Sequence, residues 1–245
     1  MKKRILGTLV LTAAIFVGCG GGGGSGGGGS STTTSYDFYS YLVNPEILTN
    51  DKVVSAIYHD VTYLDGVQDS TSTDNILSQK YDDNSIEEYY YMTSSITNTT
   101  EYYNNIFSQI PDNQYDISGT KIVSIDLDDS SQYDIKRIIS IGDKISENIT
   151  YTGSTYTCNF SKHYDSINIK DTIESFYNTT SYASIDKTYS DVLELICTDS
   201  LTDEENYIYL SKNKGFIFGM YNETTTSGEK ENLISFLSSY YVIDK

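Results

Sequence analysis

The sequence predicts an all-β domain, in which antiparallel strands follow one another as a meander and form a curved sheet, a half-barrel or a sandwich. Composition gives the first indication, because 24 of the 245 residues are tyrosine and tyrosine, isoleucine, threonine and valine favour strands. Apolar and polar residues also alternate in many short stretches. Turn residues separate these stretches at intervals of about 8–12 residues, which is typical of sandwiches and half-barrels.

The alternation locates the individual strands in chain order. Val53, Ile57 and Val61 lie on one face of the first clear strand, which ends at the turn Asp65-Gly66. The further strands are predicted at 123–127 before a turn at 128–131, 135–141 before Gly142-Asp143, 149–151 before Gly153-Ser154, 156–160, 193–197 before a loop at 200–205, 208–210 before a turn at 212–215, and 216–220.

Two regions do not follow the alternation. Residues 85–110 are rich in tyrosine and threonine and show no clear strand boundaries. Near the end of the chain, helical spacing fits about as well as strand spacing, so one short C-terminal helix is an alternative there. The residues concerned are Leu233, Phe236, Leu237, Tyr240 and Tyr241.

The first 18 residues have the pattern of a secretory signal. The cations Lys2, Lys3 and Arg4 precede an apolar run over 5–17, followed by the small residue Gly18. This order of charged, apolar and small residues defines an exported leader. The run is too short for a membrane-spanning helix, which needs roughly 20 residues.

The junction Phe16-Val17-Gly18-Cys19 resembles the lipobox of bacterial lipoproteins. In that family the signal is removed before the cysteine, and the thiol and the new amino terminus are acylated. The resemblance therefore implies that Cys19 is the lipidation site. The family usually has leucine where this chain has Phe16. Gly20 stands where the family places the aspartate that retains proteins in the inner membrane, so the resemblance implies a lipid-anchored protein of the cell envelope, at the outer membrane where one exists.

Residues 20–35 read GGGGGSGGGGSSTTTS and form a tether. A segment of this composition cannot bury apolar surface and behaves as a flexible coil with an r.m.s. span of about 20–25 Å. Three parts are thus predicted: a signal peptide at 1–18, the lipidated cysteine and its tether at 19–35, and a β-rich extracytoplasmic domain at 36–245.

The mature chain is strongly acidic. Without Lys2, Lys3 and Arg4, 13 basic residues face 34 acidic residues, a net charge near −21. Such a surface repels nucleic acid and anionic lipid headgroups. Solubility accounts for the charge; a weak affinity for cations or for a basic partner protein is the alternative.

No residue pattern predicts catalysis, a cofactor or a metal site. His59 and His163 have the acids Asp60 and Asp165 nearby, but a catalytic triad is defined by geometry and not by closeness in sequence. The pair Glu87-Glu88 and the acidic stretches at 126–134 and 199–205 invite glycosidase and calcium interpretations. The first stretch fails the calcium-loop template, since Ser131 stands in place of the glycine and Arg137 in place of the final glutamate.

Cys158 and Cys197 are predicted to form a disulfide. Both lie beyond the signal, in a part of the chain that reaches an oxidising compartment, and with Cys19 acylated no odd thiol remains. Their spacing offers no zinc-binding pattern. Both occupy the apolar side of a strand, so two buried free thiols are the alternative.

The second half of the domain resembles a group of exported β-rich lipoproteins. The elements that carry the resemblance are Tyr189–Glu194, the acidic loop Thr198–Asn206 and the aromatic hairpin Tyr207–Phe218, together with the segment Tyr36–Val43. The resemblance implies an antiparallel β fold in the envelope, with no established activity.

The function expected from these features is that of a non-enzymatic binding or structural module displayed on a membrane. A carrier or chaperone for an apolar ligand, such as a lipid or a lipoprotein, is the first alternative and would need a dry concave face of several hundred Å³. A hydrolase of cell-wall or glycan substrates is the second and would need two convergent titratable groups in a cleft. The possible partners are therefore an envelope protein or an apolar ligand, besides the membrane.

Overall fold

The computed structural model describes residues 34–42, 52–65, 67–82, 85–93, 113–118, 121–126, 132–151, 154–177, 186–224 and 228–244. Cys19, the signal and nearly all of the tether lie outside these residues, as does the predicted turn at 128–131. The strands are β1 (Ser35–Asp37), β2 (Lys52–Leu64), β3 (Val67–Asp82), β4 (Ser85–Thr93), β5 (Asn113–Ser118), β6 (Lys121–Asp126), β7 (Gln132–Lys136), β8 (Ile138–Ser140), β9 (Lys144–Tyr151), β10 (Ser154–Asn168), β11 (Thr188–Asp199), β12 (Glu205–Ser211), β13 (Gly215–Thr224) and β14 (Lys230–Asp244).

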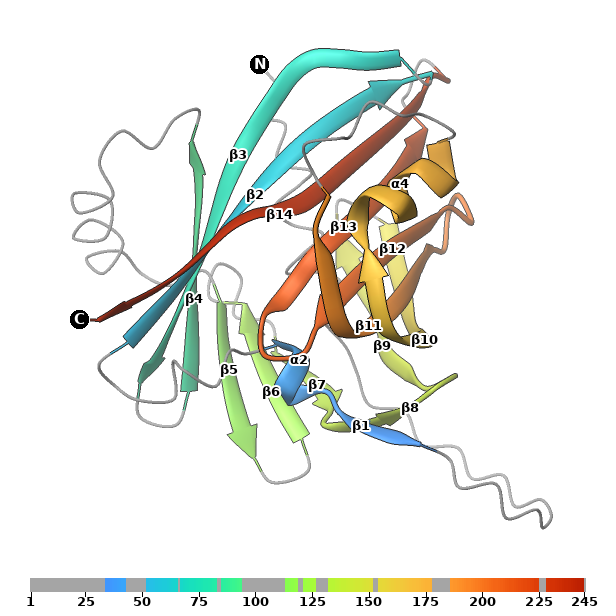
Figure 1. Cartoon of the computed structure of the whole chain (residues 1–245). Helices are drawn as coiled ribbons and strands as arrows, with labels where there is room; N and C mark the ends of the chain where they lie inside the picture. The colour runs from blue at the N-terminus through green and yellow to red at the C-terminus, as the bar shows by residue number, and fades with distance from the viewer. Residues whose placement is uncertain are drawn as a thin grey trace, which may run out of the picture.

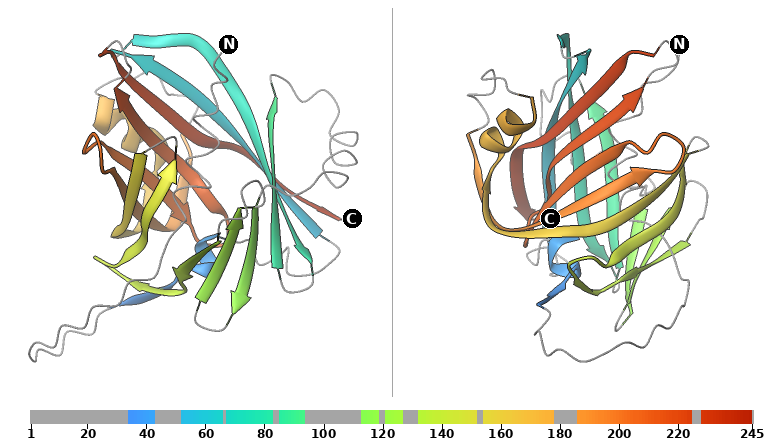
Figure 2. Two further views of the ribbon diagram at one scale, coloured as in Figure 1. Left: turned by 180° about the vertical axis from the view of Figure 1, so that it is seen from behind. Right: turned by 90° about the vertical axis from the view of Figure 1, so that its right-hand side faces the viewer.

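Twelve of these strands form one antiparallel sheet, in the order β7-β6-β5-β4-β3-β2-β14-β13-β12-β11-β10-β9. The sheet is strongly curved (Figures 1 and 2), and its edge strands β7 and β9 contact each other, so that it nearly closes on itself. The prediction of an all-β antiparallel meander in a curved sheet or half-barrel is confirmed. The sheet consists of two sequential meanders, β2–β7 and β9–β14, which are joined by the pairing of β14 with β2.

The core continues through the centre of the sheet. In β11, residues 192–195 are all buried, and alternation is visible after them, where buried Cys197 lies between the half-buried Ile196 and Thr198. The central strand β13 is buried on both faces from Gly215 to Tyr221. Phe160 of β10 and Phe218 of β13 are fully buried, as are Ile86 of β4 and Ile122 of β6, so the core extends into both halves of the sheet.

The helix α4 (Ile169–Tyr177), which lies against the β10–β13 half of the sheet (Figure 1), was not predicted. Its first turn is capped by Asn168, whose side-chain oxygen accepts a hydrogen bond of 3.2 Å from the amide of Asp171. Ile169 and Ile173, one turn apart, are fully buried. Asn168 followed by apolar residues at this spacing was the signal in the sequence.

The alternative of a short C-terminal helix is wrong. Residues 230–244 form β14, which pairs with β13 on one side and with β2 on the other. Its register with β2 shifts between Leu237 and Ser239, so the extra residue displaces the alternation by one position. Because β14 is also buried on both faces around Phe236, its apolar residues acquire a spacing that resembles that of a helix.

A second, two-stranded sheet closes the end of the domain at which the described chain begins. In it β1 pairs with β8, with Ser35 opposite Ser140 and Asp37 opposite Ile138. The short helix α2 (Tyr39–Leu42) follows at once and packs against the β12–β13 hairpin, where Asn213 donates its amide proton to the carbonyl of Ser40 at 2.7 Å. Gly215 in this hairpin has a φ of +79°, and a Cβ there would lie 3.4 Å from the carbonyl oxygen of Leu42.

Candidate functional site

A broad, open cleft of about 770 Å³ lies where β1 and α2 meet the ends of β10 and β11 and the β12–β13 turn. Its lining is almost entirely polar or aromatic. The residues that line it are Thr34, Ser35, Tyr36, Asp37, Ser40, Tyr41, His163, Asp165, Ser190, Asp191 and Lys212. The cleft is the candidate site because side chains from five elements far apart in the sequence converge there.

Asp191 organises the hydrogen bonds of the cleft. Its carboxylate accepts hydrogen bonds from the Tyr41 hydroxyl and, at 2.9 Å, from Nε2 of His163, and Nζ of Lys212 lies 3.3 Å away. Burial alone would raise the pKa of Asp191, but these three donors outweigh it and hold the pKa below its usual value. The pKa of Tyr41 is raised, first by burial and then by its hydrogen bond to the Asp191 carboxylate.

The backbone at Asp191 is in the left-handed region, with a φ of +52°. Non-glycine residues seldom adopt this conformation, although aspartate tolerates it better than most. The carbonyl of Asp191 accepts a hydrogen bond of 3.0 Å from the amide of Lys212, which fixes the distorted strand to the β12–β13 turn. The strained backbone conformation at Asp191 therefore directs its carboxylate into the cleft.

Stacked rings form one wall of the cleft. Tyr36 of β1 stacks on His163 of β10, with centroids 4.7 Å apart and planes inclined by 28°. Its edge also meets the buried ring of Phe160 at 5.4 Å. The position of β1 is fixed by Arg137, whose guanidinium lies 3.0 Å from the Asp37 carboxylate and whose carbonyl accepts the Phe38 amide proton at 2.7 Å. A flat aromatic surface beside hydroxyl and carboxylate groups suits a polar ligand with an apolar face.

The sequence identified some of these residues but not their partners. His163 pairs with Asp191 and not with Asp165, although Asp165 lines the same cleft. His59 lies on β2 and packs against the ring of Phe236 at 5.3 Å, outside the cleft. The two histidines therefore do not share a site.

The other acidic candidates are part of the framework. Glu87 and Glu88 are successive residues of β4 and point to opposite faces: Glu87 lies 2.6 Å from Nζ of Lys80, while Glu88 is bound by Gln79 at 2.6 Å and Tyr115 at 2.8 Å. They cannot act together on one glycosidic bond. Asp199 caps its own loop by accepting the Leu201 amide proton at 2.7 Å. Over the residues that the structure describes, no group of three or more His, Cys, Asp or Glu side chains could hold a metal ion.

An apolar cavity lies beneath α2, between β2, β3 and the β12–β13 hairpin. It is lined by residues such as Leu42, Val54 and Phe216 together with buried Glu88, and its volume is about 20 Å³. That space holds about one water molecule. A lipid-sized ligand needs a pocket of roughly 300–1,000 Å³, so this cavity does not support the carrier hypothesis.

Tyrosine has a second role that the composition did not reveal. Within the described residues, six tyrosine hydroxyls donate to carboxylates: Tyr41 to Asp191, Tyr89 to Glu87, Tyr115 to Glu88, Tyr164 and Tyr209 to Glu194, and Tyr207 to Glu205. Buried Glu194 accepts a third hydrogen bond, of 2.8 Å, from Ser161. The chain has 16 basic and 34 acidic residues, so there are too few basic side chains to pair with every carboxylate. Tyrosine hydroxyls supply additional hydrogen-bond donors to these carboxylates.

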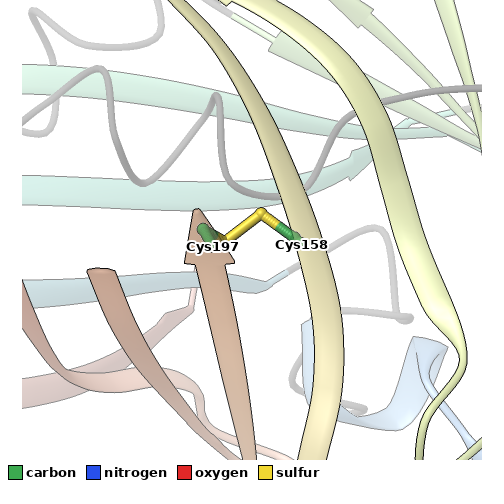
Figure 3. Close-up of a disulfide and its surroundings, with 2 residues drawn as sticks. All are labelled: Cys158 and Cys197. Atoms are coloured by element: carbon green, nitrogen blue, oxygen red, sulfur yellow. A yellow bond between two sulfur atoms is a disulfide. The ribbon is translucent and has the colours of Figure 1, made fainter. Parts of the chain in front are cut away.

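Cys158 and Cys197 lie directly opposite each other on β10 and β11 (Figure 3). Their Sγ atoms are 2.00 Å apart, at bonding distance, and their Cα atoms are 4.0 Å apart. Both side chains are buried, at 0% and 1% exposure. The cystine thus joins neighbouring strands in the half of the sheet that also carries His163 and Asp191.

Comparison with known proteins gives only distant likenesses, all of them among solved structures. No family model matches the chain, and no curated protein sequence is similar to it. A solved domain from Vibrio parahaemolyticus, named for outer membrane lipoprotein sorting, is 9% identical over 78% of this chain and 85% of its own, with a TM-score of 0.23. A DUF1329 family protein from Desulfovibrio piger is 8% identical over 80% of this chain and 87% of its own, with a TM-score of 0.22. At these TM-scores neither likeness carries a functional conclusion. In the described part of the chain no helix has the length and apolarity to cross a membrane.

Proposed function

We propose that the protein is a lipid-anchored module of the cell envelope that binds a polar ligand in the cleft around Asp191, without catalysing a reaction. The observation that carries the proposal is the state of the Asp191 carboxylate. Tyr41, His163 and Lys212 already hold it, so it is engaged in positioning and is not a free general base. The open, polar shape of the cleft supports a surface for a hydrophilic molecule.

The lipid anchor is tested by substituting Cys19. We expect Cys19→Ala to incorporate no radiolabelled palmitate and to leave the membrane fraction, because the thiol that receives the acyl chains is gone. Cys158→Ala/Cys197→Ala is the matched control, since it removes cysteines without removing the anchor site. Palmitate labelling of the Cys19→Ala variant would contradict the anchor at this residue.

Ligand binding is tested through the two histidines, His59 and His163. Their Hε1 ring protons give two NMR signals that a His163→Gln variant assigns. We expect soluble peptidoglycan fragments, as hydrophilic envelope probes, to shift the His163 signal in a saturable way and to leave the His59 signal in place, because only His163 lines the cleft. Equal shifts of both signals, or none, would contradict binding of this class of ligand in the cleft.

A further inference from the structure

The turn that follows β8 presents bulky apolar side chains to solvent. Ile138 is 53% exposed and Ile141 is 56% exposed, whereas Ile139 between them is fully buried. The alternation along β8 explains why Ile139 points inward and Ile138 outward. Ile141 has the same parity as Ile139 but lies in the turn after the strand, where it is exposed. Neither exposed position requires isoleucine. At positions this exposed, in a protein whose surface is otherwise acidic, polar side chains would be the ordinary choice.

This turn is held rigidly. Gly142 has a φ of +90°, and the amide of Asp143 donates to the carbonyl of Ser140 at 2.9 Å. The Asp143 carboxylate in turn accepts the Ser140 amide proton at 2.9 Å. A third hydrogen bond, of 2.8 Å, ties the Gly142 amide to the carbonyl of Phe160 on β10. These hydrogen bonds therefore fix the backbone of the turn that carries Ile141.

Basic residues flank these isoleucines in the sequence. Between Lys136 and Lys144 the chain has three basic residues and one acidic residue, a local charge of +2 in a protein of formal charge −18. Counting Asp37, which Arg137 holds at 3.0 Å, the patch is still +1. The Lys136 side chain is 60% exposed, and its Nζ lies 3.4 Å from the carboxylate of Asp143, the acidic residue already counted. Exposed isoleucines beside long basic side chains are typical of a surface that meets anionic lipid headgroups.

The tether joins the domain at this same place. Ser35 is its last residue, and Ser35 pairs with Ser140, the residue directly before Ile141. Sixteen residues of Gly/Ser/Thr-rich sequence separate Cys19 from Tyr36, for which the composition predicts an r.m.s. span of about 20–25 Å. The tether thus keeps the turn within reach of the lipid that holds Cys19, and a weak contact is enough at such an effective concentration.

We propose that β8 and its turn, residues 138–144, dock on the surface of the bilayer in which the protein is anchored. This inference rests on the lipid anchor proposed above. The occupant is the headgroup region of an anionic membrane, in which Ile138 and Ile141 insert while Lys136 and Lys144 remain among the phosphates. Docking would orient the domain, with the cleft around Asp191 close to the membrane plane, since Ser35 and Tyr36 line that cleft.

The chain contains no tryptophan, so a single introduced tryptophan reports its own surroundings. The full lipidated protein carrying Ile141→Trp is reconstituted into vesicles of phosphatidylethanolamine and phosphatidylglycerol, with or without brominated acyl chains. The matched control is Val67→Trp, because Val67 is 71% exposed and begins β3 at the end of the domain opposite β1 and β8 (Figures 1 and 2). Flotation of the vesicles measures anchoring separately.

We expect brominated lipid to reduce the emission of the Ile141→Trp protein by roughly half, because interfacial apolar groups lie about 5–10 Å deep. The Val67→Trp protein should keep its emission, and high salt should weaken the quenching of the Ile141→Trp protein. Flotation without quenching would overturn docking and leave the anchor intact. Loss of flotation would overturn the anchor itself. A blue shift that depends on protein density, with no quenching by brominated lipid, would identify a second copy of the chain as the occupant and overturn docking on lipid.

Discussion

Protein taken from the envelope and unfolded without reductant is expected to contain no titratable thiol. Cys158 and Cys197 are bonded across β10 and β11, and Cys19 carries lipid in the proposed mature protein. The cystine closes a loop of 39 residues. In the chain-entropy account such a crosslink stabilises the fold by about 4 kcal/mol, a large share of the 5–15 kcal/mol that is usual for a domain.

The stability effect is measured by denaturant unfolding. We expect Cys158→Ala/Cys197→Ala to lose about 4 kcal/mol of the free energy of unfolding. Reductant serves as the matched control, since it should destabilise the unmodified protein and leave the double variant unchanged. Two reactive thiols per unfolded molecule would instead establish that the cysteines are free and buried.

Alkaline solution is expected to unfold the protein cooperatively before about pH 12. Burial, assisted by the carboxylates of Asp191 and Glu194, raises the pKa of Tyr41 and Tyr209 well above the ordinary value of 10.0. Because the folded-state pKa is the higher one, the stability from these groups is complete below about pH 10 and is lost as the pH rises towards the folded-state pKa. Each phenol that only the unfolded chain can ionise costs about 1.4 kcal/mol of stability per pH unit in that window, so two phenols cost about 3 kcal/mol per pH unit.

The change in circular dichroism should therefore coincide with the ionisation of the buried phenols, as a cooperative step in phenolate absorbance above the contribution of the exposed tyrosines. In Tyr209→Phe, the dependence of the unfolding free energy on pH should become shallower by about 1.4 kcal/mol per pH unit, because one buried phenol is removed. Tyr241→Phe is the matched control, since Tyr241 is 46% exposed. Phenolate absorbance that rises gradually while the far-ultraviolet spectrum stays constant would contradict the linkage.

The sequence predicted most strands because side-chain alternation and turn residues are local signals. The turn at 212–215 was found from Asn213 and Gly215, and both have positive φ angles in the structure. The prediction from the sequence was ambiguous where a strand is buried on both faces and carries a bulge. This is the case in β14 around Leu237. The helix α4 was missed because its nine residues lie among strands, although Asn168 and the Ile169/Ile173 spacing marked it.

The candidate site was less predictable because its contacts are long-range. His163 was singled out, but Asp191 lies 28 residues away and Tyr41 lies 150 residues from Asp191. Only the pairing of β10 with β11 and the packing of α2 bring them together. The pairing of tyrosine hydroxyls with carboxylates was equally hidden, since composition counts tyrosines without showing where their hydroxyls point.

The central place of β14 has a consequence for how the chain matures. A protein secreted from its amino terminus would deliver β2 first and β14 last, yet these two strands are neighbours in the middle of the sheet. Until the final 15 residues of β14 emerge, the inner edge of β2 would remain an unpaired strand edge, the kind of surface that promotes aggregation. Completion of the sheet thus has to wait for the emergence of β14, and the early meander would need shielding until then.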